Sequence, residues 1–302
     1  MTQQTKYPKN ILLAVDGSGH AFAATKLLGD LPLSSESLIT AISVLIPRHA
    51  QFSTSLESLL EQAQKQLAIS QARIQTEVIA GYPAEIINQF AAEHQSDLTV
   101  VGAKGLRSTL GILLGGVAQQ VVEYSCCPVM VVRAPYDGLR RIMLVVDGSE
   151  HGLAAAEYLA HFCLPEQYQL HLMHVLPPIY QVDFITQAWP TGMDITPPIP
   201  TENFEARLKE QAEADQTRGE ELLKSTQHQL EKYGIEATIA MERGDAATQI
   251  INYAKEQDID LIVAGSRGLS QIQSWLLGSV SRKLVHYAGC SVLIVKTPPE
   301  QE

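Results

Sequence analysis

Short apolar runs, rich in valine, isoleucine and leucine, alternate along the chain with longer stretches in which apolar positions recur at helical spacing. The stretch 55–69 is one of the latter, and Leu56, Leu60 and Leu67 share one face of the helix it predicts. Alternating strands and helices predict a parallel sheet covered on both faces. The expected strands are 10–15, 38–44, 74–79, 98–102, 129–132, 141–146, 170–175, 237–241, 261–265 and 292–295.

The same unit occurs twice in the chain. The similar stretches are 11–21 and 142–152, 97–105 and 260–268, and 126–132 and 289–295. We therefore predict an α/β protein of two tandem, open, five-stranded parallel-sheet domains of Rossmann-like form, with residues 1–136 in the first and 137–302 in the second. An exposed apolar edge strand favours pairing, so we expect the two copies to form an internal pseudo-dimer through their last strands.

The second copy is longer than the first. The offset between the copies is 131 residues from Asp16 to Asp147 but 163 from Gly102 to Gly265, so the second copy has about 32 additional residues. The sequence places them in the segment 177–200, where six prolines exclude a regular helix or a central strand. This segment carries Tyr180, Phe184 and Trp189. A packed surface excursion, a lid over a ligand and a self-association surface all remain open.

Composition excludes several classes of partner. The 302 residues include 22 Lys and Arg against 33 Asp and Glu, and the resulting net charge of -11 opposes binding to nucleic acid or anionic membrane. We expect no membrane-spanning segment and no signal peptide, and therefore a cytoplasmic protein. The four cysteines lack metal-site or disulfide-framework spacing. His171 and His174 lie three apart in a strand and point to opposite faces, so we expect no metal site there.

A glycine-rich stretch follows the strand 261–265 and carries the strongest functional signal. Gly265, Gly268 and Gly278 lie where the strand ends and where the next helix begins, a setting in which backbone N–H groups bind phosphate. The stretch lacks the spacing of a P-loop. The turns after the first strands match the dinucleotide fingerprint only in part, which disfavours a dinucleotide-binding domain.

The spacing Gly265-x2-Gly268-x9-Gly278-Ser279 resembles the ATP-binding signature of the universal stress protein family. The strand ends VDGS and HV and the closing strand are also similar to that family, over nearly all of both copies except 177–200. The resemblance implies adenine-nucleotide binding, with ATP as the ligand and Mg²⁺ arriving with its phosphates. We expect no catalytic residue and no metal ligand of the protein's own.

The resemblance also implies roles for individual residues of the second copy. Asp147 would lie beside the adenine and ribose, and Val175 would meet the base. The sugar and phosphates would be held by Gly265, Arg267, Gly268, Gly278, Ser279, Val280 and Ser281. Other interpretations stay open: an aspartate before Gly-Ser is often a turn former, Val175 is a core residue in any case, Arg267 suits a solvated loop, and Ser279 suits a helix cap.

The first copy keeps the glycines but loses the hydroxyls. Gly116 and Ala118 stand where the second copy has Ser279 and Ser281. We therefore expect a weaker site in the first copy, made of Asp16, Val44, Gly102, Gly105, Gly115 and Gly116.

Three functions fit the sequence. The first is an adenine-nucleotide-binding stress-response regulator whose occupancy sets its conformation or assembly. The second is a slow ATP hydrolase, although residues 265–281 contain no Asp, Glu or His to act as base or metal ligand. The third is a structural or partner-binding protein with vestigial loops. Dimerisation between chains is left open.

Overall fold

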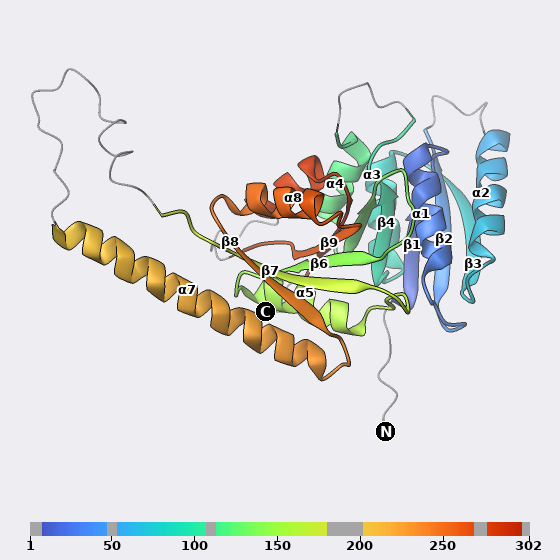
Figure 1. Cartoon of the computed structure of the whole chain (residues 1–302). Coiled ribbons are helices and arrows are strands. Elements are labelled where there is room, and N and C mark those ends of the chain that lie inside the picture. The colour runs from blue at the N-terminus through green and yellow to red at the C-terminus, as the bar shows by residue number, and fades with distance from the viewer. Residues whose placement is uncertain (1–7, 47–52, 107–112, 180–201, 269–276, 298–302) are drawn as a thin grey trace, which may run out of the picture.

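The computed structural model describes residues 8–46, 53–106, 113–179, 202–268 and 277–297. Within these residues ten strands form one sheet, in the order β3-β2-β1-β4-β5-β10-β9-β6-β7-β8 (Figure 1). The strands are β1 (Asn10–Ala14), β2 (Leu38–Leu45), β3 (Arg73–Ala80), β4 (Leu98–Gly102), β5 (Val129–Val132), β6 (Arg141–Val145), β7 (Gln169–Leu176), β8 (Ala237–Arg243), β9 (Leu261–Gly265) and β10 (Ser291–Val295). All ten predicted strands are present, with bounds within two residues of those expected.

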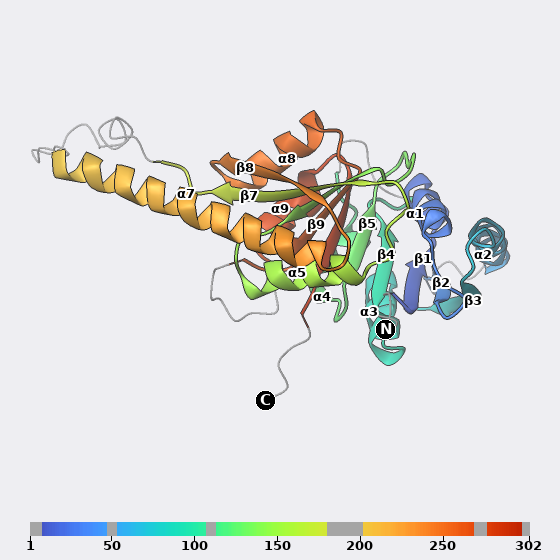
Figure 2. The same cartoon turned by 60° about the horizontal axis from the view of Figure 1, so that its bottom comes forward.

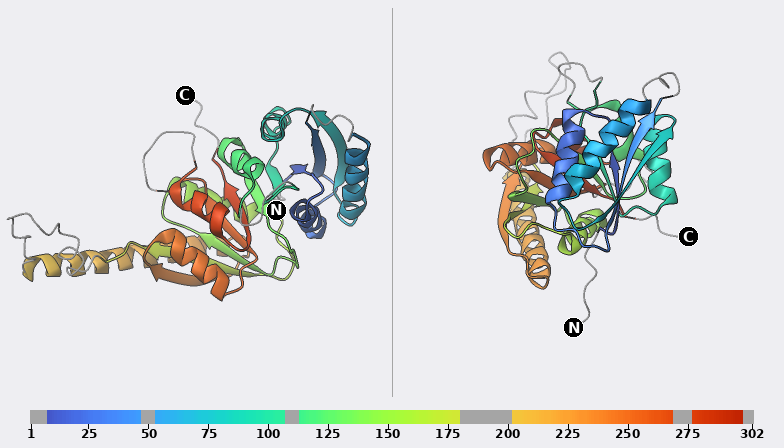
Figure 3. Two further views of the ribbon diagram at one scale, coloured as in Figure 1. Left: turned by 90° about the horizontal axis from the view of Figure 1, so that it is seen from above. Right: turned by 90° about the vertical axis from the view of Figure 1, so that its right-hand side faces the viewer.

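The two copies meet through their last strands. All strand pairs within a copy are parallel, whereas β5 and β10 pair antiparallel, with Val131 opposite Val292 and Val129 opposite Ile294. The predicted pseudo-dimer is therefore confirmed. Figure 3 shows the first copy, in blue to green, at one end of the sheet and the second copy, in light green to red, at the other.

Helices cover both faces of the sheet (Figure 2). On one face α1 (Gly19–Asp30), α2 (Ser53–Leu67), α5 (Glu150–His161) and α7 (Glu202–Glu231) pack on one hydrophobic cluster. On the other face α3 (Pro83–Glu93), α4 (Gly116–Tyr124), α8 (Ala246–Glu256) and α9 (Ser279–Tyr287) pack on a second cluster. The central strands β5, β9 and β10 are buried along their whole length, which explains why their sequences do not alternate.

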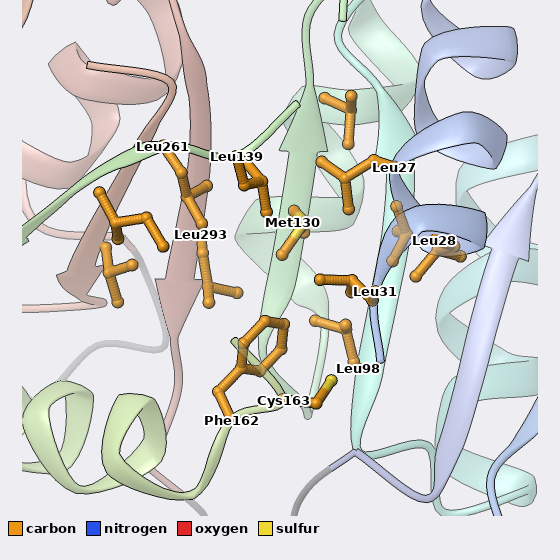
Figure 4. Close-up of a cluster of buried hydrophobic side chains, with 14 of the residues drawn as sticks. Leu27, Leu28, Leu31, Leu98, Met130, Leu139, Phe162, Cys163, Leu261 and Leu293 are labelled. Carbon is orange, nitrogen blue, oxygen red and sulfur yellow. The ribbon is translucent and has the colours of Figure 1, made fainter. Parts of the chain in front are cut away.

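The hydrophobic core runs continuously across the junction of the copies. Figure 4 shows Leu98 and Met130 of the first copy in the same cluster as Phe162, Leu261 and Leu293 of the second. A hydrogen bond from the Tyr158 hydroxyl to the Asp97 carbonyl (3.1 Å) adds a polar link between the copies. Neither half of the sheet presents its last strand to solvent.

Helix α7 accounts for much of the additional length of the second copy. It has 30 residues, against 15 in its counterpart α2, so the proline-rich connection holds only part of the extra residues. The chain from Glu202 onward is rich in Glu, Lys, Gln and Ala, which favour a helix. The segment 180–201, with Tyr180, Phe184 and Trp189, lies outside the described residues.

Helix α7 extends past the sheet at one end (Figures 1 and 2). Its C-terminal half is anchored by the buried Leu223 and Leu230 and by Gly219, where a Cβ would come within 2.9 Å of a Leu176 methyl. Among the described helices, none has the length and apolar character required to cross a membrane.

Candidate functional site

The strand ends of the second copy bring the predicted residues to one edge of the sheet. Strands β6, β7, β9 and β10 are parallel, so Asp147, Val175 and Gly265 all lie at or just beyond carboxyl ends. This edge is where ligands bind in open parallel sheets. Val175 is half-buried and packs on the hydrophobic cluster of the second face.

Gly265 allows helix α5 to approach the end of β9. A Cβ at this position would lie 2.5 Å from both the carbonyl carbon and the carbonyl oxygen of His151, which are backbone atoms of the first turn of α5. No side chain fits in that space. The glycine is therefore required for helix packing, and it holds the start of α5 directly beside the loop that follows β9.

Gly268 lies against the carboxylate of Asp147. A Cβ on Gly268 would be 2.6 Å from Asp147 Oδ2. The other carboxylate oxygen, Oδ1, accepts hydrogen bonds from the backbone N–H (3.0 Å) and the hydroxyl (2.5 Å) of Ser149, and Gly148 between them has φ +80°. Asp147 thus forms the turn after β6 with one oxygen. Its other oxygen faces the glycine loop, which is the stretch between β9 and α9 that contains Gly268 and Gly278.

Gly278 joins the two ends of the glycine loop. Its N–H donates to the carbonyl of Ser266 (2.8 Å), and a Cβ would come within 3.2 Å of Arg267 Cα. The residues that follow β9 and the residues that begin α9 therefore lie side by side, which brings the two predicted phosphate-binding glycines Gly268 and Gly278 together. Residues 269–276, which connect them, lie outside the described residues.

Helix α9 begins without a side-chain cap. Its N-cap is Gly278, which makes no capping hydrogen bond, whereas Ser149 caps α5 and Asp245 caps α8. The N–H groups of the first turn therefore have no side-chain oxygen as acceptor in the described part of the chain, and the positive end of the helix dipole is at the same place. Both features favour an anion.

Ser279 and Ser281 differ in what their hydroxyls contact. Ser279 is exposed at the start of α9. Ser281 is buried, and its hydroxyl donates to the carbonyl of Gly265 (2.7 Å), which ties α9 to the end of β9. Of the two serine hydroxyls expected to donate to phosphate, only that of Ser279 is left, because the Ser281 hydroxyl already donates its proton to the Gly265 carbonyl.

A positive charge lies close to the loop. Arg267 is half-buried, and no hydrogen bond or ion pair to another described residue holds its guanidinium. Burial lowers the pKa of His151, and the nearby charge of Arg267 lowers it further. Thr297 shares a hydrogen bond of 2.8 Å with His151 Nδ1. The imidazole is thus predominantly neutral near pH 7, and Arg267 supplies a positive charge on this side of the loop.

The first copy reproduces this backbone geometry. A Cβ on Gly105 would lie 2.6 Å from Asp16 Oδ2, and the N–H of Gly115 donates to the carbonyl of Ala103 (2.8 Å). A Cβ on Gly102 would clash with the first turn of α1 at 2.8 Å. Val44 lies at the end of β2, and Gly116 opens α4 with nothing within 4 Å of a Cβ. The hydroxyls of the second copy have no counterpart here.

A model of the universal stress protein family matches residues 8–133 and, a second time, residues 138–296. The chain belongs to the universal stress protein family. A universal stress protein of Mycolicibacterium smegmatis is 26% identical over 308 residues, covering 95% of this chain and 96% of the relative. The universal stress protein YxiE of Bacillus subtilis is 29% identical over 156 residues, covering 52% of this chain and 98% of the relative.

A solved structure supports the fold of this tandem universal stress protein. The crystal structure of a universal stress protein from Archaeoglobus fulgidus matches with a TM-score of 0.63 and 19% sequence identity, covering 97% of each chain. The likeness extends over both copies. This agreement is with the arrangement of both halves, and not with one domain alone.

Two basic residues of this universal stress protein were missed by the motif analysis. Arg133 directly follows β5, and Lys296 directly follows β10. Arg133 donates to backbone carbonyls of Leu113 (2.8 Å) and Val285 (2.8 Å), and Lys296 donates to that of Glu123 (2.9 Å). A basic residue after the last strand of each copy was visible in the sequence, but its contacts across the junction were not.

Proposed function

We propose that this universal stress protein is a cytoplasmic, ATP-binding stress-response regulator whose tighter nucleotide site lies in the second copy. The observation that carries nucleotide binding is the hydrogen bond from Gly278 N–H to the Ser266 carbonyl (2.8 Å), and the exposed Ser279, which the first copy lacks, carries the preference for the second copy. This hydrogen bond places the glycine turn after β9 beside the uncapped start of α9, at the sheet edge that also holds Asp147 and Val175. This is the arrangement that an anionic nucleotide requires.

Each part of the site suits one part of the nucleotide. The N–H groups of the first turn of α9 and the hydroxyl of Ser279 would hold phosphate oxygens, and Arg267 would add a positive charge. Asp147, whose Oδ2 faces the glycine loop, would lie beside the ribose, and Val175 would contact the base. Ser281 acts indirectly, since its hydroxyl holds α9 against Gly265. Mg²⁺ would accompany ATP, bound mainly by the phosphates.

In this function ATP binding sets the conformation or assembly of the protein, with at most slow hydrolysis. The carboxylate that faces the loop, Asp147, already accepts two hydrogen bonds from Ser149 through its other oxygen. It is thereby fixed as a turn residue, which suits a positioning role. The alternative of vestigial loops predicts no ATP binding at either copy, so a titration separates the two.

The test is ATP titration in the presence of Mg²⁺ on the full chain and on Gly268→Val and Gly278→Val. A branched side chain at either position enters space now occupied by Asp147 or by the backbone of Arg267, so the second-copy site should be lost while circular dichroism stays unchanged. Gly289→Ala is the matched control, because nothing lies within 4 Å of its Cβ. Unchanged ATP affinity in both valine variants would reject the loop as the site.

A further inference from the structure

The glycine loop of the first copy lies between β4 and α4, as that of the second copy lies between β9 and α9. Contacts across the β5–β10 junction join the two loops. The guanidinium of Arg133 donates from Nη1 to the carbonyl of Leu113, which lies in the first-copy loop (2.8 Å). From Nη2 it donates to the carbonyls of Val285 (2.8 Å) and His286 (3.2 Å), in the last turn of α9. One side chain therefore contacts the loop of one copy and the final helix of the other.

Helix α9 connects this contact to the second-copy loop. Nine residues at about 1.5 Å each make a rigid rod of about 13 Å between its ends. The start of α9 is fixed to the second-copy loop by Gly278 N–H and by the Ser281 hydroxyl. The positive guanidinium at the other end lies at the negative end of the helix dipole. The contacts therefore form a continuous path from the Leu113 carbonyl to the second-copy loop.

A second set of contacts runs in the opposite direction. Arg282 of α9 donates to the carbonyl of Leu277 in the second-copy loop (3.3 Å) and forms an ion pair with Glu123 of α4 (3.7 Å). Lys296 donates to the carbonyl of Glu123 in the last turn of α4 (2.9 Å). Helix α4 begins at the first-copy loop, so each loop is linked to the last helix of the other copy.

We propose that Arg133 is a positioning residue shared by both nucleotide sites, through which ATP bound in one copy changes the affinity of the other. The inference rests on the proposed ATP binding. A lysine at this position keeps the charge, but its single ammonium group cannot span the carbonyls of Leu113 and Val285 as the planar guanidinium does. Because coupling between binding sites is reciprocal, it is measurable from either copy.

The test is a two-site ATP titration of the full chain, with Arg133→Lys as the variant and Arg243→Lys as the control. Arg243 also bridges two backbone carbonyls, of Pro177 and Ala212, but both lie within the second copy and neither belongs to α9. We expect the intact chain and the control to show coupling of about fivefold or more between the sites. Arg133→Lys should reduce the coupling to near onefold while both sites still bind ATP.

A second measurement does not depend on changing Arg133. In Gly278→Val, where only the first copy is expected to bind, ATP should alter hydrogen exchange in the last turn of α9. Two sites that bind without coupling, coupling that survives in Arg133→Lys, or ATP binding at one site only would each overturn the inference while the proposed function stands. No ATP binding in any protein would refute both.

Discussion

The two glycine loops have the same backbone contacts at their described ends but different side chains. In each copy the last loop glycine donates its N–H to the backbone carbonyl of the residue that follows the fourth strand, at 2.8 Å. The middle glycine lies against the carboxylate of the aspartate that follows the first strand. Beyond that frame the second copy has Ser266, Arg267, Ser279 and Ser281, where the first has Ala103, Lys104, Gly116 and Ala118. The conformation of each loop therefore requires the glycines, whereas the polar side chains are free to differ.

One of these differences is structural. Ser281 holds the start of α9 to the Gly265 carbonyl, and the buried Ala118 of the first copy makes no such bond. A second serine in a phosphate-binding motif can thus act on the loop itself and not on the ligand. The difference that bears directly on phosphate is the exposed Ser279, for which the first copy has Gly116.

The largest expected effect is on the free energy of unfolding, and it tests the close contact between a strand-end glycine and a helix that both copies share. Gly265→Ala places a methyl group 2.5 Å from backbone atoms of His151, and we expect a loss of about 3 kcal/mol in the free energy of unfolding. Gly102→Ala, with its nearest contact at 2.8 Å, should lose about 2 kcal/mol. Urea denaturation measures both, with the exposed Gly289→Ala as a near-neutral control. A Gly265→Ala protein as stable as the control would show that this close contact is not required.

A smaller expected effect, on ATP affinity, tests the exposed side chain that differs between the two loops. Ser279→Gly gives the second copy the first-copy residue, and losing one hydrogen bond to a charged phosphate should weaken ATP binding about tenfold. The reciprocal Gly116→Ser has room, because nothing lies within 4 Å of a Cβ there, and it should strengthen the first-copy site. Calorimetric titration of the two variants checks both directions. Equal affinities before and after the exchange would remove Ser279 from the account.

The sheet was predictable from sequence because each strand has its own apolar run and the set of runs occurs twice. Ten apolar runs gave ten strands, and the repeat supplied the antiparallel partner for β5. The position of the additional residues was predicted only in part, because we expected them in 177–200, whereas α7 has 30 residues against 15 in α2. A count of additional residues cannot divide them between a connection and a helix.

The glycines show where sequence reasoning stopped. Their position between a strand end and a helix start predicts a phosphate-binding loop. Packing within the protein also requires two of these glycines, because a Cβ would lie 2.5 Å from His151 at Gly265 and 2.6 Å from Asp147 at Gly268. Likewise, the hydroxyl of Ser281 and the guanidinium of Arg133 bond to carbonyls 16 and 152 residues away, respectively. Such partners follow from the packing of helices on the sheet, which no motif encodes.

Calorimetric titration of ATP with Mg²⁺ into the intact chain, Gly278→Val and Gly115→Val tests most directly whether the second copy holds the tighter nucleotide site. We predict two unequal sites, with the tighter one lost in Gly278→Val and retained in Gly115→Val, and an affinity ratio of about tenfold or more. Two equal sites, or a tight site that disappears only in Gly115→Val, would contradict the assignment of the second copy as the principal nucleotide site.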